Sequence, residues 1–168
     1  ESFDPHEPWD APKEFLELYS PTNYQGIEPI WPGGLVDNYT KEEFGRIKAH
    51  YAGECSHVDK WVGHVVDTLQ SQHLLDDTIV MFISDHGCIM GEQGQIHKGQ
   101  DRLRIQVTRC PLIIRMPEAQ HAGTVVDGFF QHQDIMPTLL SLINQTVPKR
   151  CNGKNFWPLI TKNQPISL

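Results

Sequence analysis

The sequence predicts an α/β fold in which a mixed, largely parallel sheet is flanked by helices, and three observations favour this class. Residues 40–69 carry apolar side chains every three or four positions, as on the buried face of a helix. Residues 78–84 (TIVMFIS) form one continuous apolar and β-branched run, typical of a strand buried on both faces of a sheet. Residues 110–117 (CPLIIRMP) predict a second strand.

The first 39 residues predict a loop-rich segment that precedes this core. They are rich in proline, which denies helix interiors and central strands a hydrogen-bond donor. A short helix is expected near residues 13–19 (KEFLELY). Because 168 residues suffice to bury a hydrophobic core, we expect a single domain over residues 1–168, with the loop-rich segment at 1–39 and the α/β core at 40–168.

The helix over residues 40–69 is the clearest element of the sequence. Thr40 is expected to cap its N-terminus, because Glu43 stands three residues later and completes a capping box. We expect its apolar face to lie in the core; the face is formed by Phe44, Ile47, Tyr51, Cys55, Val58, Val62, Val65 and Leu69. Three histidines are expected at the surface or flanks of this helix: His50, His64 and His73.

Later segments complete the predicted fold. Residues 124–130 (TVVDGFF) predict a third short strand, and residues 133–143 (QDIMPTLLSLI) predict a helix with Asp134 near its start. Pro137 is expected in the first turn of that helix, where its missing N–H costs nothing. Residues 152–165 (NGKNFWPLITKNQP) predict a turn followed by a small helix.

The charge of the chain argues against two classes of partner. Fourteen Lys and Arg residues against 21 Asp and Glu residues give a net charge of −7, which disfavours nucleic acid and anionic membranes. The apolar runs are too short for a bilayer-spanning helix, so no membrane partner is expected. The four cysteines include no C-x-x-C pair, which disfavours a zinc ribbon. The compartment and homo-oligomerisation are left open.

Residues 82–99 (FISDHGCIMGEQGQIHKG) gather side chains that bind metals and anions at the end of a predicted strand. In open α/β sheets ligands bind beyond the carboxyl ends of the strands, where Asp85 and His86 are expected. A carboxylate beside an imidazole suits a divalent metal ion. The local composition is equally compatible with an ordinary turn, in which Asp85 caps the loop and His86 is solvated.

Lys98 and two further histidines favour a site over a turn. A lysine in a loop that returns to a metal offers a point charge to an anionic group, and His97 beside it is suited to donate a proton to a leaving oxygen. His6 lies between two prolines in FDPHEPWD (residues 3–10) and is a candidate substrate-binding imidazole. Each of these residues taken singly is weak evidence.

A second group of polar residues, Ser56, His57 and Asp59 in CSHVD, contains the residue types of a hydrolytic triad. We do not expect a triad here. Neighbouring residues of a helix project about 100° apart, so Ser56 and His57 cannot present a nucleophile to its base.

Six segments together resemble the sulfatases and the related phosphonate monoester and arylsulfate hydrolases of the alkaline-phosphatase superfamily. They are FDPHEPWDAP, YAGECSHVDKWVGHVVDTL, DDTIVMFISDHG, GEQGQIHKG, RCPLIIRMP and HQDIMPTLLSLI. The resemblance covers nearly the whole chain, in family order. It implies the C-terminal part of an alkaline-phosphatase-like catalytic domain, with a divalent metal at the carboxyl edge of a mixed sheet.

The resemblance also implies roles for single residues. Asp85 and His86 match two of the family's metal ligands, and Lys98 matches the lysine that binds the non-bridging oxygens of the ester. His6 matches the histidine that contacts the sulfate or phosphate group, and His97 is assigned to the same shell. The metal would be Ca²⁺ or Mn²⁺, with Zn²⁺ or Mg²⁺ as alternatives. The substrate would be a sulfate or phosphonate ester of a small molecule or glycan.

The family nucleophile, a formylglycine made from the Cys or Ser of a C/S-x-P-x-R motif, is not found in this sequence. None of the four cysteines, Cys55, Cys88, Cys110 and Cys151, has that context. We therefore expect the nucleophile and the remaining metal ligands in an N-terminal half outside this chain, which would act as its partner. The isolated fragment is expected to be inactive.

Two alternatives stay open at this point. One is another branch of the superfamily, a nucleotide phosphodiesterase or phosphomutase with a Thr or Ser nucleophile and two metals. Lys98 argues against it, because its spacing after SDHG suits the one-metal pattern better. The other is a non-catalytic module that binds a metal or an anion.

Overall fold

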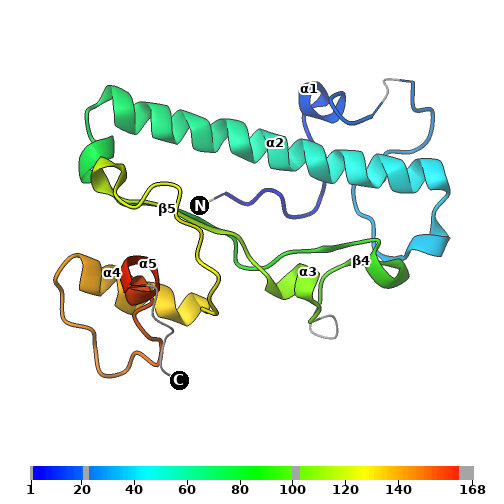
Figure 1. The fold of residues 1–168 in the computed structure, drawn as a ribbon. Coiled ribbons are helices and arrows are strands. Elements are labelled where there is room, and N and C mark those ends of the chain that lie inside the picture. Colours follow the sequence, from blue (N-terminus) through cyan, green and yellow to red (C-terminus); the bar gives the residue numbers. More distant parts are fainter. Residues whose placement is uncertain (1, 21–22, 100–102, 163–168) are drawn as a thin grey trace. The chain divides into compact units, whose positions relative to one another are not determined.

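The computed structural model describes residues 2–20, 23–99 and 103–162 (Figure 1). The chain divides into two compact units. Unit 1 comprises Glu1–Leu75 and Phe82–Leu112, and unit 2 comprises Asp76–Met81 and Ile113–Leu168. All five predicted site residues therefore belong to unit 1.

Unit 1 is built around the 31-residue helix α2 (Lys41–Ser71). The short helix α1 (Lys13–Leu16), strand β1 (Gly34–Leu35) and the 3-10 helix η1 (Val36–Asn38) precede it. Strand β3 (Ile89–Met90), the 3-10 helix η3 (Glu92–Gly94), strand β4 (Gln95–His97) and helix α3 (Ile105–Thr108) follow it. The helices predicted near residues 13–19 and over residues 40–69 are confirmed.

Helix α2 begins with the capping box that the sequence predicts. The Thr40 hydroxyl accepts a hydrogen bond from the Glu43 amide at 3.2 Å, and Glu43 Oε2 accepts one from the Thr40 amide at 2.8 Å. Further along, Gly53 lets α1 pack closely against α2. A Cβ atom on Gly53 would lie 2.8 Å from the Cβ of Ala11, so a larger side chain would push the two segments apart.

The core of unit 1 joins three distant parts of the sequence. Trp9, Ile47 and Ile96 are almost completely buried against one another, and so bring together the N-terminal segment, α2 and β4. Partly buried side chains surround them: Val36, Tyr39, Phe44, Tyr51, Cys88 and Met90. A smaller cluster of Ala11, Leu16 and Ala49 holds α1 on α2.

The predicted core face of α2 is only partly correct, although Val58, Val62 and Leu69 are half-buried. Phe44, Ile47 and Tyr51 pack in the core, whereas Cys55 and Val65 are exposed, the latter by 59%. None of the helices in the described ranges combines the length and apolar character needed to span a membrane.

The surface position predicted for His50 is wrong. His50 is 3% exposed, and its Nε2 lies 2.8 Å from Glu28 Oε2. The physical reason is that the N-terminal segment, which carries Glu28, contacts this part of α2. His64 and His73 are exposed, as predicted.

The strands form two small sheets. In unit 1, β1, β4 and β3 form an antiparallel sheet with β4 in the middle, in which Gly34 faces Ile96 and Ile89 faces His97. The predicted strands at 78–84 and 110–117 are confirmed as β2 (Val80–Ile83) and β5 (Leu112–Arg115), which pair with each other. The expected burial of β2 on both faces is not observed within this chain, because Phe82 is exposed and β5 is its one neighbour among the described strands.

Unit 2 contains the predicted C-terminal helices. The 3-10 helix η5 (His132–Asp134) leads into α4 (Ile135–Leu142), with Pro137 in the first turn as expected, and α5 (Trp157–Lys162) follows later. The buried Asp134 ties them together, because its carboxylate accepts hydrogen bonds from the Gln131 and Lys154 amides, both at 2.8 Å. Thr138 adds a second link, since its hydroxyl accepts from the Phe156 amide at 3.0 Å.

The strand predicted at residues 124–130 is wrong. These residues adopt no regular secondary structure, and all but Phe130 are exposed. Their β-branched and aromatic composition favours a strand only where a neighbouring strand accepts its hydrogen bonds, and no described strand pairs with them. The remaining short elements are the 3-10 helices η2 (Leu75–Asp77) and η4 (Pro117–Ala119).

Candidate functional site

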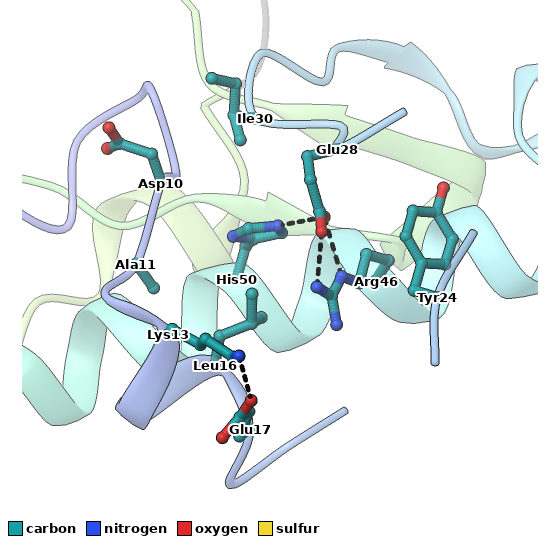
Figure 2. A pocket seen from close by; sticks show the side chains of 10 residues that line it. All are labelled: Asp10, Ala11, Lys13, Leu16, Glu17, Tyr24, Glu28, Ile30, Arg46 and His50. Atoms are coloured by element: carbon teal, nitrogen blue, oxygen red, sulfur yellow. Dashed lines mark hydrogen bonds and ion pairs between the residues drawn. The ribbon is translucent and has the colours of Figure 1, made fainter. Parts of the chain in front are cut away.

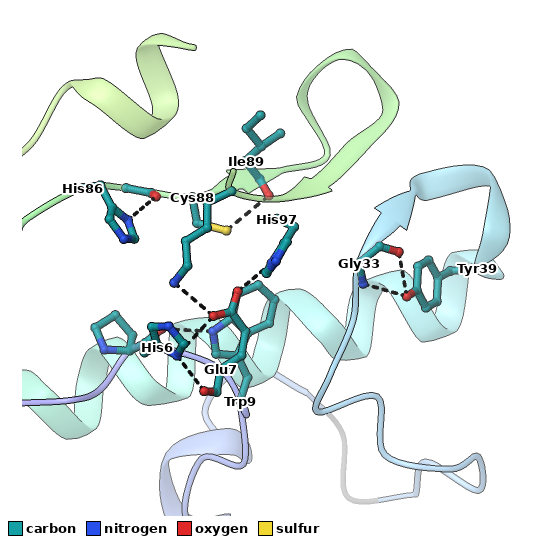
Figure 3. Close-up of polar contacts among 12 residues, drawn as sticks. His6, Glu7, Trp9, Gly33, Tyr39, His86, Cys88, Ile89 and His97 are labelled. Atoms are coloured by element: carbon teal, nitrogen blue, oxygen red, sulfur yellow. Dashed lines mark hydrogen bonds and ion pairs between the residues drawn. The ribbon is translucent and has the colours of Figure 1, made fainter. Parts of the chain in front are cut away.

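Three of the five predicted site residues converge on one buried carboxylate, that of Glu7. His97 Nδ1 lies 2.8 Å from Glu7 Oε1, and Lys98 Nζ lies 3.0 Å from Glu7 Oε2. His6 Nδ1 is 3.3 Å from the same Oε2 atom. Figure 3 shows the rings of His6 and His97 on either side of this carboxylate. Residues 90 positions apart in the sequence are thereby brought into contact.

The carboxylate is the most enclosed group of this cluster. The Glu7 side chain is 1% exposed, whereas that of Lys98 is 18% exposed and those of His6 and His97 are about two-fifths exposed. The cationic and imidazole groups therefore reach solvent around a buried anion. A substrate arriving from solvent would meet the histidines and the lysine before it met Glu7.

The hydrogen bonds of His6 fix the position of its ring proton. His6 Nδ1 lies 2.7 Å from the backbone carbonyl oxygen of Glu7, which can only accept, so Nδ1 carries the hydrogen and donates it. Nε2 is then left for a ligand. It can donate to an anionic oxygen only when the imidazole is protonated.

Local structure explains how these side chains are held. His6 and Glu7 lie between Pro5 and Pro8, and Trp9 anchors the loop through its buried ring and an Nε1–H bond to the Pro5 carbonyl oxygen at 3.0 Å. His97 ends β4 with a φ of +108°, a conformation that costs energy for a residue with a side chain. The pairing of His97 with Ile89 and its contact with Glu7 hold it there.

Charge partners outweigh burial at Glu7. Burial by itself raises the pKa of a carboxyl group, but the Glu7 backbone amide, Lys98 and His97 act in the opposite direction and leave the pKa of Glu7 below its ordinary value. Glu7 is therefore an anion at neutral pH. Nothing in the spacing of the sequence distinguished it from a solvated loop glutamate, and sequence reasoning missed it.

Asp85 and His86, the predicted metal ligands, follow β2 after one intervening residue, Ser84. Asp85 Oδ2 and His86 Nε2 lie 3.6 Å apart, a separation that one ion can bridge at ordinary metal–ligand distances of about 2.0–2.6 Å. His86 Nδ1 lies 3.0 Å from the Gly87 carbonyl oxygen and must donate to it, which leaves Nε2 as the ligand atom. Both side chains are exposed. The donor set and its geometry therefore fit a divalent metal.

The loop behind this pair is tightly built. The Gly87 amide donates to the Val107 carbonyl oxygen at 2.8 Å, and a Cβ atom on Gly87 would overlap the Gln106 carbonyl oxygen. Only glycine permits this approach of the loop to helix α3. The backbone carbonyl of Asp85 also contacts Cys110 Sγ at 3.5 Å. The orientation of Asp85 and His86 is therefore set by contacts that the sequence pattern did not show.

A different group of ligand-type atoms lies on α2 and the N-terminal segment. Among the described residues, Asp4, Glu54 and His57 are the one set of three or more acidic, histidine or cysteine side chains whose ligand atoms lie within 4.8 Å of one another. His57 Nε2 already accepts a hydrogen bond from Trp61 Nε1 at 2.8 Å. Neither Asp85 nor His86 belongs to it.

Ser56, His57 and Asp59 do not form a catalytic triad in the structure. Ser56 Oγ lies 2.6 Å from the hydroxyl of Tyr19, and His57 is engaged by Trp61. Ser56 and His57 therefore have partners outside the group and do not contact each other as nucleophile and base.

A pocket of about 390 Å³ lies elsewhere in unit 1 (Figure 2). In its lining, the carboxylate of Glu28 accepts two hydrogen bonds from Arg46, at 2.8 and 2.6 Å, and lies 2.8 Å from His50 Nε2. None of the five predicted site residues lines it. The two cationic side chains that line it are both paired, Arg46 with Glu28 and Lys13 with Glu17 at 3.5 Å.

Residues 2–145 match the family model described as Sulfatase. The chain belongs to the sulfatase family. The resemblance to the sulfatases is therefore confirmed. The roles that it implied for His6, Lys98, Asp85 and His86 stay predictions.

Curated relatives carry sulfatase and phosphatase-superfamily names. The arylsulfatase of Clostridium perfringens is 29% identical over 177 residues, covering 93% of this sulfatase chain and 35% of that protein. Arylsulfatase K of Gallus gallus is 33% identical over 125 residues, covering 73% and 22%. The multifunctional alkaline phosphatase superfamily protein PehA of Trinickia caryophylli is 30% identical over 124 residues, covering 73% and 24%. The chain thus spans about a quarter to a third of these relatives.

Solved structures give the same fold. The phosphonate monoester hydrolase of Agrobacterium radiobacter matches 98% of this chain with 38% of its own, at a TM-score of 0.80 and 24% identity. The phosphonate monoester hydrolase SpPMH of Silicibacter pomeroyi matches 77% of this chain with 25% of its own, at a TM-score of 0.68 and 29% identity. The α/β, alkaline-phosphatase-like fold class is confirmed.

Proposed function

We propose that this sulfatase-family chain supplies the anion-binding and part of the metal-binding side of a metal-dependent sulfuric ester hydrolase. The observation that supports it most is the convergence of His6, His97 and Lys98 in unit 1, from segments 90 residues apart. A site that must neutralise a tetrahedral oxyanion needs imidazole and ammonium groups within reach of solvent, and those of His6, His97 and Lys98 are partly exposed.

In the proposed reaction, each residue has a distinct task. Lys98 offers its ammonium group to the non-bridging oxygens of the ester, and His6 donates to the same group when its ring is protonated. His97, held at Nδ1 by Glu7, has its Nε2 for proton transfer at the bridging oxygen. These interactions strengthen as negative charge develops on the transferred group and the leaving oxygen.

Asp85 and His86 are proposed to hold the divalent metal, which supplies further positive charge to the oxyanion when bound. Among the described residues no third acidic, histidine or cysteine side chain joins this pair within ligand distance. We therefore propose that the other ligands come from residues outside this chain. Carboxylates among them would favour Ca²⁺, while His86 favours Mn²⁺ or Zn²⁺, and Mg²⁺ stays an alternative.

The attacking group is proposed to be a formylglycine outside this chain. None of the four cysteines stands in a C/S-x-P-x-R context, and the relatives named above are about three to five times as long as the matched segment. We accordingly propose that the chain is one part of a single catalytic domain. Separated from the rest of that domain, it should not turn over esters.

Sulfate esters of small molecules or glycans are the proposed substrates. BT4656, whose solved structure holds its substrate D-glucosamine-2-N,6-O-disulfate, matches 77% of this chain at 27% identity. An N-acetylglucosamine-6-O-sulfatase of Bacteroides thetaiotaomicron is 32% identical over 103 residues. The similarity to SpPMH supports phosphonate monoesters as a second candidate class.

Replacing Lys98 tests the proposal in the complete enzyme. Lys98→Ala should lower kcat/KM for a chromogenic aryl sulfate by about 100- to 1000-fold, the usual loss when one oxyanion-stabilising group is removed. Lys60→Ala is the matched control, because Lys60 is an exposed lysine that pairs with Glu14 on the surface. Turnover of both aryl sulfate and aryl phosphonate within a few-fold of wild type would contradict the assignment of Lys98.

A further inference from the structure

We propose that Glu7 is a positioning residue that holds His97 and Lys98 in their working geometry. This inference rests on the proposed hydrolase function and adds to it a residue that the comparisons do not assign. Glu7 itself is too deeply buried to meet a substrate, so it acts through its partners.

The two carboxylate oxygens of Glu7 contact different side chains. Oε1 faces His97 Nδ1 at 2.8 Å, and Oε2 faces Lys98 Nζ at 3.0 Å. Because Glu7 is ionised, both oxygens only accept, so His97 Nδ1 must carry a hydrogen. His97 Nε2 is then the atom that faces away from Glu7, and the imidazole is fixed in one tautomer. The Glu7 carboxylate also restrains the Lys98 side chain, so that its ammonium group stays close to His97.

An amide in place of the carboxylate cannot do both tasks. A glutamine at position 7 has one accepting oxygen and one donating nitrogen. If the oxygen faces His97, the NH₂ group faces the ammonium of Lys98 and repels it. If the oxygen faces Lys98, the NH₂ group faces His97 Nδ1 and forces the opposite tautomer. The Glu7 side chain is 1% exposed, so water has little access to the position of the lost acceptor.

A second carboxylate of this chain, that of Glu28, serves as the control for Glu7, because it has similar partners but contacts none of the predicted site residues. Glu28 likewise accepts from a histidine and a cationic side chain, His50 and Arg46, in the same unit. The hydrogen bonds and ion pairs of Glu28 given above involve none of the predicted site residues. If carboxylate–histidine–cation groups served stability alone, Glu7→Gln and Glu28→Gln would affect the enzyme in the same way.

The experiment is a comparison of these variants in the full-length, metal-loaded enzyme with an aryl sulfate as substrate. Glu7→Gln should lower kcat about 10- to 100-fold and change KM less than about threefold, because the positioned groups act mainly in the transition state. Glu7→Asp, which keeps both accepting oxygens on a shorter stem, should recover part of the loss. Glu28→Gln should keep kcat within about twofold of wild type.

A double-variant comparison separates positioning from general damage. In an enzyme that already carries Lys98→Ala or His97→Gln, adding Glu7→Gln should cost much less than it does in the wild type, because part of what Glu7 positions is gone. A merely structural role would lower activity by the same factor in every background. Equal factors would therefore overturn the inference.

The outcomes also distinguish this inference from the proposed function. If Lys98→Ala retains turnover, the proposed function has failed and Glu7 has nothing to position. If Lys98→Ala loses turnover while Glu7→Gln stays within threefold of wild type, only the role of Glu7 is overturned. If Glu7→Gln does not fold, a crystal structure of the wild-type enzyme decides, because His97 Nδ1 or Lys98 Nζ beyond hydrogen-bond distance of Glu7 would overturn it.

Discussion

At the scale of single residues, three glutamates of unit 1 show how neighbouring charge decides the state of a carboxyl group. Two hydrogen bonds from Arg46, with a contribution from His50, lower the pKa of Glu28 to about 2. Burial raises the pKa of Glu7, but its backbone hydrogen bond, Lys98 and His97 together leave the pKa below its ordinary value. Glu54 has the opposite surroundings, because burial and the nearby Asp4 and Asp10 raise its pKa to about 7.

Glu54 should make the protein less stable as the pH rises. Its folded-state pKa of about 7 lies above the ordinary 4.5, so between these values the folded chain keeps a proton that the unfolded chain has lost. Stability should therefore fall from pH 4.5 to 7 and change little above that range on account of this group. Glu54→Gln should remove this slope and raise the free energy of unfolding at pH 8, on the order of 1–3 kcal/mol.

Thermal melts of the full-length protein at several pH values between 5 and 8 measure this effect. Glu14→Gln is the control for loss of a surface carboxylate, since Glu14 is largely exposed. A variant whose melting temperature follows the wild type at every pH would show that Glu54 does not titrate in this range.

At the scale of elements, α2 combines a sequence-encoded start with a face that is only half covered. The capping box and the first half of the apolar stripe are both built from neighbouring turns of one helix, so local spacing predicted them. The second half of the stripe has the same periodicity, but Val65 is 59% exposed and none of its residues is fully buried. Periodicity tells which side chains share a face and does not tell how far a core extends.

The capping box predicts a specific loss of stability. Thr40→Ala removes the hydroxyl that accepts from the Glu43 amide and should lower the free energy of unfolding by about 1 kcal/mol. Thr68→Ala is a matched control in the same helix, because the Thr68 hydroxyl donates only to the His64 carbonyl oxygen within the helix. Denaturant titrations of the full-length protein compare the two; equal effects of both substitutions would contradict the capping role of Thr40.

At the scale of the whole molecule, the chain is a sulfatase-family segment whose predicted site residues all lie in one of its two units. His6 comes from the N-terminal segment, Asp85 and His86 from the end of β2, and His97 and Lys98 from the end of β4. The proposed metal ligands and the groups around Glu7 are thus held by separate loops. The predicted single domain over residues 1–168 stays a prediction, which we extend by proposing that this domain includes residues outside the chain.

Removing a proposed metal ligand tests this arrangement. In the full-length enzyme, His86→Ala should reduce bound divalent metal after dialysis to about a tenth of wild type or less and reduce aryl sulfate turnover in proportion. Elemental analysis by mass spectrometry measures the metal directly. His64→Ala, which alters an exposed histidine of α2, should keep full metal content. A full complement of metal in His86→Ala would exclude His86 as a ligand.

The sequence by itself determined the α/β class, the cap and first half of α2, the strands β2 and β5, and the family, because each depends on local spacing or on a short motif. It also predicted His6, Asp85, His86, His97 and Lys98 as site residues, and their roles stay predictions. Only the tertiary structure decided that Glu7 joins three of them, that His50 is buried against Glu28, and that residues 124–130 form no strand. Those outcomes depend on which distant segments meet, and the burial and charge that result are properties of the contact, not of either segment alone.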